Sequence, residues 1–393
     1  MLTHLTKATS IGAALFLLVP AAHADGRQTG PHLIVSANDN KVMLVNGVTT
    51  TVKNPPPDTA TVIDVSAAPP RVVAELRVPA SIVGPPQSAA IAPDQSIALV
   101  TAATKIDPAD PSRTIPDDTV SVIDLQASPP VVLGTVRAGS GASGVSINPA
   151  GTLALVANRM AGTVSVFTIK GKTVAAAGTI DLGAPGSGPC HAIFTPDGRS
   201  ALVTRNNDSL ISVLRVEGAK VEYTKQDIAA GLKPYGIDIT PSGDVALAAN
   251  IGAGATGGAD TVSVIDLRAT PPRAVNHLTV GPVAEGISIS PDGRYAAVTV
   301  MNGSNAPKSS PLFNDFGLLR ILGLKGTALT SVAEARVGHW CQGAGWSADS
   351  GTVLVQCAAE REILVFRFDG RTLQRAASIK VDGAPSGFSL TRR

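Results

Sequence analysis

Apolar and polar residues alternate in short runs along most of this chain, and the runs come in pairs separated by a tight turn. The stretch "GISISPDGRYAAVTV", residues 286–300, is one such pair. In its turn Pro presets φ, Asp can hydrogen-bond to its own backbone, and Gly accepts positive φ. The pattern predicts a β-hairpin. Near copies begin at Gly144 ("GVSINPAGTLALVAN"), His191 ("HAIFTPDGRSALVTR") and Gly236 ("GIDITPSGDVALAAN"), with weaker copies at Ser88 and Gly343.

Two further strands complete each repeat. After a variable loop comes a run with period-two alternation, such as "DTVSVIDL" at 118–125 and again at 260–267. A fourth run, such as "RAVNHLTVG" at 273–281, leads into the next copy. The copies begin 45 to 57 residues apart. Four antiparallel strands at this period are typical of the blade of a β-propeller.

The two ends of the chain supply one blade between them. A seventh copy, "GFSL" from Gly387, stops after one strand. Its three missing partners have counterparts in "HLIVSAN" from His32, "TATVIDV" from Thr59 and "VVAELRV" from Val72. We therefore predict an all-β fold, a seven-bladed β-propeller closed by pairing of a C-terminal strand with N-terminal strands. Such pairing covers the faces that an open ring would expose.

With these motifs the chain resembles the YVTN-repeat family of seven-bladed propellers, which are related to the lactonase-like propellers. The family's tetrapeptide occurs loosely in "ALVAN" (154–158) and "ALVTRN" (201–206), whereas the "SPDG" turns and "TVSVIDL" strands match more closely. The resemblance covers essentially the whole chain after its first residues. It implies the fold, while family members include enzymes, surface-layer modules and proteins of unknown role, so function has to be argued from a site.

The first residues have the pattern of a secretion signal. Lys7 supplies a positive charge, residues 11–19 form an apolar core too short to span a bilayer, and Ala22-His23-Ala24 is a small-residue cleavage site. We expect residues 1–24 to be a signal peptide and 25–393 to be one propeller domain, periplasmic or secreted, with no membrane span. The formal net charge of +2 includes Lys7 and argues against nucleic acid as a partner. Glycine (39) and proline (29) are abundant and aromatic residues scarce (3%), which suits many strands and turns.

One rim of the propeller gathers the unusual side chains. We label the strands of a blade A to D from the axis outward, so that loops B–C and D–A share one face. B–C loops vary widely, being long at 101–117, 251–259 and 301–316, and variable loops on a rigid scaffold are where binding is expected. The same face collects polar candidates for a pocket at the mouth of the central channel, namely Asn158, Arg159, His191, Arg205, Asn206, Tyr235, Glu285, His339, Trp340 and Gln342.

Each candidate also has a plainer interpretation. An Asn after a strand often only satisfies local backbone, a single His is more often packed or solvated than a ligand, and Glu285 also suits a solvated loop. Arg159 and Arg205 follow neighbouring B strands at what we take as equivalent positions. They would make a cationic pair suited to carboxylate or phosphate, although salt bridges between blades explain them equally well.

Two functions therefore compete. The first is an exported propeller that binds a small ligand or a periplasmic partner protein on the loop-rich face. The alternative is a lactonase-like hydrolase or lyase in which His191 or Glu285 moves a proton or activates water. In that case Arg205, with Arg159, would hold a substrate carboxylate or stabilise an oxyanion. A metal shared by His191, Glu285 and His339 has least support, and motifs for haem, phosphate loops and catalytic zinc are absent from the sequence, so we expect no cofactor and no metal. The oligomeric state stays open.

The three cysteines are expected to differ in state. Cys341 and Cys357 lie eight residues on either side of Asp349, at the centre of an A–B turn. In a regular hairpin they would face each other, and export favours oxidation, so we predict a Cys341–Cys357 disulfide that a one-residue bulge would prevent. Cys190 is then unpaired. Its neighbour His191 should point to the opposite face of the strand, so we expect Cys190 to be a small buried side chain rather than a nucleophile.

Overall fold

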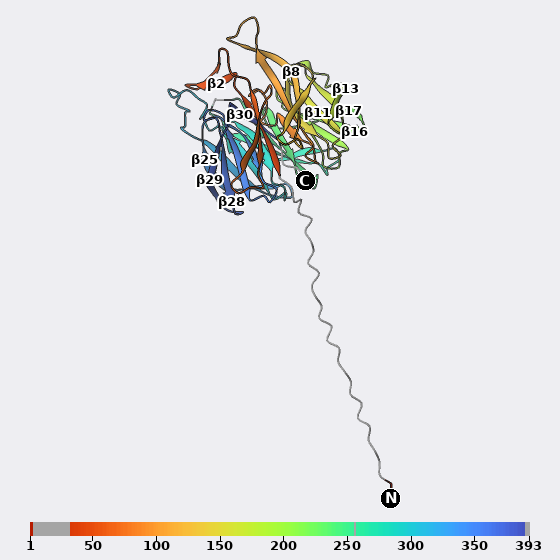
Figure 1. Ribbon diagram of the computed structural model, residues 1–393. Coiled ribbons are helices and arrows are strands. Elements are labelled where there is room, and N and C mark those ends of the chain that lie inside the picture. Colours follow the sequence, from red (N-terminus) through yellow and green to blue (C-terminus); the bar gives the residue numbers. More distant parts are fainter. Residues whose placement is uncertain (3–31, 255–256, 390–393) are drawn as a thin grey trace. The chain divides into compact units, whose positions relative to one another are not determined.

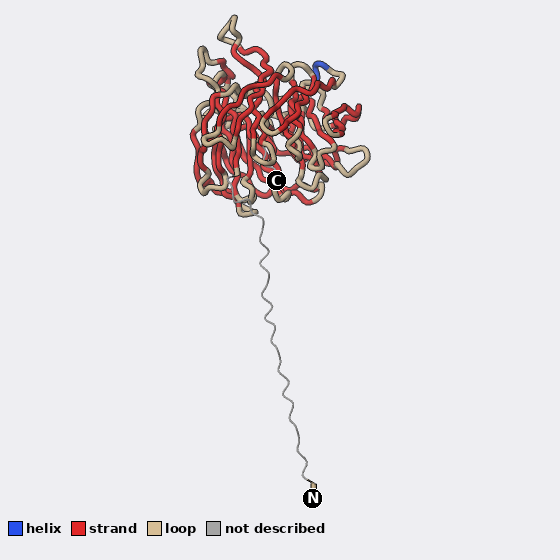
Figure 2. Tube along the Cα trace, turned by 45° about the vertical axis from the view of Figure 1, so that its right-hand side comes forward, coloured by secondary structure: helices blue, strands red, loops and turns tan. Residues whose placement is uncertain are grey.

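The structure is a computed structural model that describes residues 1–2, 32–254 and 257–389. The predicted signal peptide therefore lies outside the described residues, apart from Met1 and Leu2. The described residues from His32 onward fall into one compact unit. Nearly all of its regular structure is strand, and its one helical segment is a short 3-10 turn, η1 (Pro185–Ser187) (Figures 1 and 2).

The described unit contains seven four-stranded antiparallel sheets, each of which is one blade of the predicted propeller, and one two-stranded sheet. In the order A to D, blade 1 contains β30 (Ala384–Phe388), β1 (Leu33–Asp39), β4 (Thr59–Asp64) and β5 (Arg71–Arg77). Blade 2 contains β6 (Ala89–Ile91), β7 (Ile97–Ile106), β8 (Thr114–Asp124) and β9 (Val131–Arg137). Blade 3 contains β10 (Ala142–Ile147), β11 (Leu153–Asn158), β12 (Thr163–Lys170) and β13 (Thr173–Asp181).

The other four blades follow the same order without interruption. Blade 4 contains β14 (Pro189–Phe194), β15 (Ser200–Arg205), β16 (Leu210–Glu217) and β17 (Lys220–Ala229). Blade 5 contains β18 (Pro234–Ile239), β19 (Val245–Asn250), β20 (Asp260–Asp266) and β21 (Arg273–Gly281). Blade 6 contains β22 (Ala284–Ile289), β23 (Tyr295–Val300), β24 (Gly317–Lys325) and β25 (Ala328–Val337). Blade 7 contains β26 (Cys341–Trp346), β27 (Thr352–Cys357), β28 (Glu362–Phe368) and β29 (Leu373–Lys380).

The two ends of the chain close the ring. Strand β30 pairs antiparallel with β1, and Phe388 lies opposite Ser36. Beyond the strand, the Ser389 N–H donates to Val35 O, and the Val35 N–H donates to Ser389 Oγ. The predictions of seven blades and of closure by a shared blade are both confirmed.

Burial explains why the sheets pack as blades. Residues of the A and B strands are almost all buried, whereas the D strands β5 and β9 are largely exposed. Apolar clusters lie between consecutive sheets, so each blade buries its faces against its neighbours. Near the axis, threonines of B strands donate across the seam to the carbonyl of the next A strand, as in the 2.9 Å bond from Thr204 Oγ1 to Tyr235 O. Thr101 and Thr299 make the same contact with Ser143 O and Gln342 O.

Two of the connections on the loop-rich face are more regular than the sequence analysis predicted. The segment 101–117 was expected to be a loop, but β7 continues to Ile106 and β8 begins at Thr114, so the two strands extend beyond blade 2 as a hairpin (Figure 1). The hairpin formed by β2 (Val42–Val45) and β3 (Val48–Thr51) was not predicted. Its turn is Asn46-Gly47 with positive φ at both residues, a sequence typical of two-residue hairpin turns.

The predicted Cys341–Cys357 disulfide is confirmed, with an S–S distance of 2.04 Å. The role of the bulge is the reverse of the predicted one. Near the turn Trp346 pairs with Val353, a register that would place Cys341 one residue out of step with Cys357. A shift between Cys341 and Ala344 moves the pairing by one residue and brings the two cysteines opposite each other. Cys190 is buried and unbridged, as predicted.

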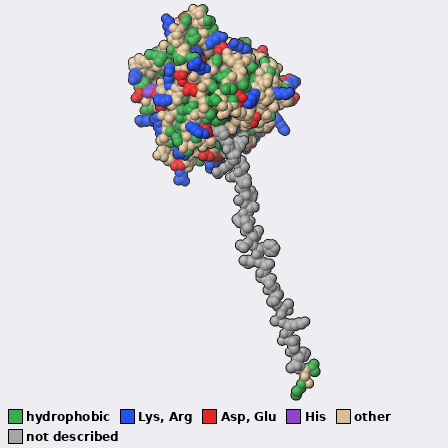
Figure 3. Space-filling model, viewed as in Figure 1, with side chains coloured by type: hydrophobic (Ala, Val, Ile, Leu, Met, Phe, Trp, Pro, Cys, Tyr) green, Lys and Arg blue, Asp and Glu red, His purple; other side chains and the backbone are tan. Residues whose placement is uncertain are grey.

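The surface shows no single-sign charged region on the side seen in Figure 3, where basic and acidic side chains are interspersed. None of the helices in the described part of the chain has the length and apolar character that crossing a bilayer would require.

Candidate functional site

A recurrent irregularity places one A-strand residue per blade beside the axis. In six blades the pairing of strands A and B shifts by one residue at the same point, between Ala142 and Val145 in blade 3, for example. Each shift leaves one A-strand residue without a pairing partner. This residue directly precedes the glycine of the repeat, or the residue that stands in its place. We call these positions the axial ring. Its members are Ser143, Cys190, Tyr235, Glu285, Gln342 and Ser386, with Gln87 in the corresponding place of blade 2.

The channel inside this ring is filled by part of the connection from blade 1 to blade 2. We call residues 84–87 the plug. The Gly84 N–H donates to the Tyr235 hydroxyl at 3.1 Å. Gln87 Nε2 donates to Ile237 O and Ile287 O, in blades 5 and 6, at 3.1 and 3.2 Å. The sequence analysis placed a polar pocket at the channel mouth but did not predict that the chain crosses the channel there.

Arg159 brings a positive charge to the ring from the end of strand B in blade 3. Its Nη1 donates to Cys190 Sγ, and its Nη2 donates to Asn206 Oδ1 at 3.3 Å. The guanidinium carbon lies 5.6 Å from the centre of the Tyr235 ring, a cation–π distance. Among the described residues Arg159 forms no ion pair with a carboxylate, and the residue is half-buried. The cation therefore has only neutral hydrogen-bonding partners there.

Glu285 is the acidic member of the ring. Burial raises its pKa to about 8, while a hydrogen bond from Gln342 and the charge of Arg159 lower it. The residue as a whole is half-buried, but its Oε2 atom is buried and has no hydrogen-bond partner among the described residues, and the same holds for Gln342 Oε1. At neutral pH Glu285 therefore largely holds a proton, and the charge of Arg159 is only partly neutralised.

The other two titratable ring members are neutral near pH 7. Burial raises the pKa of the Cys190 thiol to about 11, against the lowering effect of Arg159. Burial likewise raises the pKa of Tyr235, again opposed by Arg159. Cys190 is fully buried and Tyr235 nearly so, which leaves Arg159 and Glu285 as the ionisable groups of the site that solvent reaches.

We expect Glu285→Gln to stabilise the protein at pH 9 but not at pH 5. A folded-state pKa of about 8 lies above the ordinary value of 4.5, so the folded protein binds this proton more tightly than the unfolded chain does. The associated stability is fully present below pH 4.5 and is lost as the pH rises through 8. We expect Gln to gain about 2 kcal/mol over Glu at pH 9. Thermal unfolding at pH 5, 7 and 9 measures this, with Glu334→Gln, an exposed carboxylate paired with Arg320, as control. A difference that does not vary with pH would contradict the assignment.

Arg205 and Arg159 are not equivalent, contrary to the sequence-based expectation. Register pairs Ala142 with Asn158 and Pro189 with Arg205, so Arg205 corresponds to Asn158, and Arg159 to Asn206. The Arg205 side chain points into its own blade, where it contacts Asp208, lies 3.3 Å from Asp227 and donates to Ser212 Oγ.

Asn158 has a comparable local arrangement. Its amide joins Gly139 N–H, Thr163 Oγ1 and Ser165 Oγ within blade 3. Asn250 binds Thr261 and Ser263 in the same way in blade 5. These contacts match the plainer interpretation of an Asn that satisfies the end of its own blade.

His191 lies in the seam between blades 3 and 4. It occupies the position that five other repeats give to glycine, and its ring reaches to 2.7 Å from the point where a Cβ on Gly144 would lie. Glycine at 144 therefore makes room for the imidazole. His191 is almost fully buried in this seam. Its neighbour Cys190 instead faces Arg159, so the two adjacent side chains point in different directions, as expected.

His339 and Trp340 lie at the rim of the loop-rich face. His339 Nδ1 is 2.7 Å from Glu360 Oε1, and its Nε2 is 3.0 Å from Asp315 Oδ1 in the 301–316 loop. Burial lowers the pKa of His339, but its hydrogen bonds to both carboxylates raise it more, with a net upward shift. Trp340 is buried in an apolar cluster with Val283 and Met301. The structure thus brings Arg159, Asn206, Tyr235, Glu285 and Gln342 together near the axis, apart from the His339 rim cluster.

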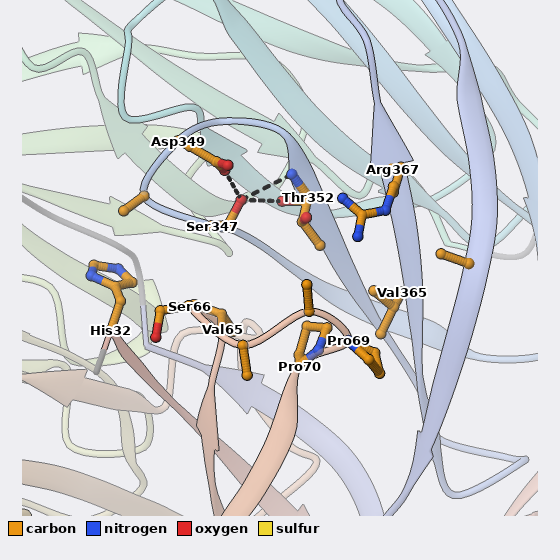
Figure 4. A pocket seen from close by; sticks show the side chains of 14 residues that line it. His32, Val65, Ser66, Pro69, Pro70, Ser347, Asp349, Thr352, Val365 and Arg367 are labelled. Atoms are coloured by element: carbon orange, nitrogen blue, oxygen red, sulfur yellow. Dashed lines mark hydrogen bonds between the residues drawn. The ribbon is translucent and has the colours of Figure 1, made fainter. Parts of the chain in front are cut away.

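Three cavities among the described residues lie away from the axial ring, in seams near the A–B and C–D turns. One, of about 270 Å³, lies between blades 1 and 7 and is lined by His32, Ser66, Asp349 and Arg367 (Figure 4). Others of about 210 Å³ and 410 Å³ lie between blades 5 and 6 and between blades 1 and 2. None of the site residues predicted from the sequence lines any of the three.

Solved structures that superpose on most of this chain support the propeller fold. A putative 6-phosphogluconolactonase from Bacteroides uniformis superposes with a TM-score of 0.68 at 16% identity, covering 91% of this chain and 98% of that one. A periplasmic gluconolactonase from Pseudomonas aeruginosa gives a TM-score of 0.64 at 17% identity, with coverage of 91% and 98%. A functionally unknown protein from Desulfotomaculum acetoxidans gives 0.67 at 15% identity, with coverage of 92% and 98%. No family model and no curated protein matches the chain. Similarity at this level shows the propeller fold alone, and membership of the YVTN-repeat family stays a prediction.

Proposed function

We propose that this protein binds a small anionic ligand, with a carboxylate as its simplest anchor, on the loop-rich side of the axial ring. The observation that carries the proposal is the half-buried Arg159, whose partners in the described structure are the neutral Cys190, Asn206 and Tyr235. A guanidinium in these surroundings has unused donors and an incompletely balanced charge, and carboxylates satisfy both.

Neighbouring groups support a ligand that also carries hydroxyls. The buried oxygens Glu285 Oε2 and Gln342 Oε1 have no partner among the described residues, and hydroxyl groups would donate to them. The plug, which fills the channel beside these residues, favours a small molecule over a threaded chain. Binding of a periplasmic protein by the rim loops stays the competing prediction. Residues 1–24 and the disulfide support export of the protein.

Gluconate and sorbitol make a matched pair of probes, because both are open-chain, share the hydroxyls of C2 to C6 and differ in the carboxylate at C1. We expect gluconate to bind more tightly, and Arg159→Gln to weaken its binding about 100-fold, which corresponds to the loss of about 2.7 kcal/mol from charge-assisted hydrogen bonds. Calorimetric titration of the full chain measures this. Arg215→Gln is the control, since Arg215 is exposed and pairs with Glu217 and Glu222 on the outside of blade 4.

The pH dependence of binding separates a site at Glu285 from one elsewhere. Gluconate affinity should fall as the pH rises through 8, because ionised Glu285 then opposes the ligand and balances Arg159. Glu285→Gln should remove this dependence. Equal affinities for gluconate and sorbitol, or no effect of Arg159→Gln, would refute the proposal.

Lactone hydrolysis is the second candidate function. A carboxyl group with a pKa of about 8 beside a cation favours it, because its ionised form, whose share grows as the pH approaches 8, can accept a proton from water while Arg159 stabilises the developing oxyanion. The two gluconolactonase names among the similar propellers agree with this chemistry. Arg205 is already paired with carboxylates, and His191 lies in the seam between two blades. Glu285 and Arg159 are therefore the stronger candidates for the residues that would hydrolyse a lactone. Turnover of a lactone panel above the uncatalysed rate would favour hydrolysis, and binding without turnover the first function.

A further inference from the structure

A second cluster of reactive side chains lies at the rim of blade 7. The Sγ atoms of Cys341 and Cys357 and a carboxylate oxygen of Glu360 all lie within 4.8 Å of one another. His339 adds its Nδ1, which is 2.7 Å from Glu360 Oε1. In the described part of the chain Cys341, Cys357 and Glu360 form the group of His, Cys, Asp and Glu side chains whose ligand atoms come close enough to share a metal ion, and His339 stands outside it. The set His191, Glu285 and His339, considered from the sequence, forms no such group there.

We propose that reduction of the Cys341–Cys357 disulfide opens a site for a thiophilic divalent metal ion, with Zn²⁺ as the best match. The ligands would be the two cysteine sulfurs and Glu360, with His339 Nδ1 as a fourth ligand once its side chain moves toward the sulfurs. Two thiolates with one imidazole and one carboxylate make a donor set that suits tetrahedral zinc. The disulfide excludes the ion, because each sulfur is then bonded to the other and neither is a thiolate.

The surroundings are already arranged for ligation. His339 Nε2 faces Asp315 Oδ1 at 3.0 Å, so a metal on Nδ1 would leave the Nε2–H donating to a carboxylate. Such an outer carboxylate fixes the tautomer and ring orientation of metal-binding histidines. The His339 N–H donates to both Glu360 oxygens at 2.9 and 3.0 Å, which holds Glu360 against the D–A connection.

The partly exposed side of the cluster provides a path for the ion. The two cysteines are 1% and 0% exposed, so the sulfurs lie beneath the surface. The side chains of His339 and Glu360 are 30% and 27% exposed and form the outer side of the cluster. An ion would enter past the imidazole and the carboxylate and meet the sulfurs last.

The opening step is a two-electron reduction. A dithiol reductant gives two electrons and two protons, its own sulfurs become a disulfide, and Cys341 and Cys357 become thiols. Zinc binding then releases the two thiol protons to solvent. Reoxidation of the pair would expel the ion.

Cobalt(II) is the probe, because thiolate ligation gives it charge-transfer absorption and tetrahedral geometry gives it intense visible bands. The full chain, reduced with a phosphine and desalted without oxygen, is titrated with Co²⁺ and then with Zn²⁺. We expect one equivalent of cobalt to bind with both spectral features, and zinc to displace it. The oxidised protein should show neither feature. Asp315→Asn should weaken binding about 10-fold by loosening the imidazole.

Variants identify the ligands. Glu360→Gln and His339→Gln should each weaken cobalt binding at least 10-fold, whereas His277→Gln, a histidine on strand D of blade 5, should leave it unchanged. The thermal midpoint of the reduced protein, measured with and without zinc, gives a readout that needs no variant, and zinc should raise it. A folded, reduced protein without thiolate-to-cobalt absorption overturns the proposal. So does wild-type affinity in both ligand variants, or a reduced protein that unfolds and does not refold with zinc.

Discussion

Phe388→Ala is expected to lower the free energy of unfolding by about 3–5 kcal/mol, the usual cost of deleting a fully buried aromatic side chain. Phe388 is 0% exposed and packs with Ile34, Ile63 and Leu354, in blades 1 and 7. It is carried by β30, the strand that closes the ring, so the cavity would form at the seam where the two ends of the chain meet. Chemical denaturation of the full chain, followed by circular dichroism, measures the change.

An exposed apolar residue serves as the control for the burial of Phe388. Leu232→Ala removes an apolar side chain that is 55% exposed and should change stability by less than about 0.5 kcal/mol. Deletion of residues 384–393 removes the whole of β30 and should prevent cooperative folding of the propeller, because β1 then presents an open edge. A deletion variant that unfolds in one transition at the wild-type midpoint would show that closure of blade 1 contributes little.

The repeated hairpins were predictable because the residues that specify each hairpin lie close together in the sequence. Pro-Asp-Gly turns and period-two alternation specify strand, turn and strand within fifteen residues, and the fixed period then gives the number of blades. The Asn46-Gly47 turn of β2 and β3 carried the same kind of signal and was overlooked. The cysteine pairing was predicted correctly although two details of its register differ. Near the turn the pairing is one residue later than a turn centred on Asp349 gives, and the bulge shifts it back.

The site was harder to predict because its geometry depends on single-residue shifts and on contacts across the ring. One residue of offset separates Arg159, which faces the axial ring, from Arg205, which pairs with acids inside its own blade. The plug depends on contacts between Gln87 and residues 150 and 200 positions away. The length of the connection between β5 and β6, from Val78 to Ser88, was a usable signal, since it is the longest D–A connection.

The plug in turn depends on a buried charged group at its base. Lys41 is 5% exposed, and its Nζ lies 2.6 Å from Asp58 Oδ2 and 3.3 Å from Asp39 Oδ1. It also donates to Ala80 O. The carboxylates are tied to the same connection, since Asp39 Oδ2 accepts the Ile82 N–H at 2.8 Å and Asp58 Oδ2 accepts the Ala80 N–H at 3.1 Å. One lysine therefore neutralises two acids that anchor the segment leading to Gly84 and hence to Tyr235.

Lys41→Met should lower the free energy of unfolding by about 3–5 kcal/mol at pH 8, because removal of one partner leaves buried charge uncompensated. Burial already raises the pKa of Asp39, with Lys41 lowering it and Asp58 raising it. Without Lys41 the folded-state pKa of Asp39 rises further above its unfolded value, so the deficit should grow with pH and shrink toward pH 5. Denaturant unfolding at pH 5 and 8 measures both effects.

The matched control is Lys172→Met. Lys172 lies 2.7 Å from Asp124, almost the same separation as Lys41 from Asp58, but its side chain is 41% exposed, so its loss should cost at most about 1 kcal/mol. Equal losses of unfolding free energy in the two variants would show that burial of the Lys41 cluster does not determine how much the cluster contributes to stability. Because the cluster anchors the plug, Lys41→Met should also weaken gluconate binding, while Lys172→Met leaves it unchanged. Destabilisation without any change in gluconate affinity would mean that the plug does not position the axial ring.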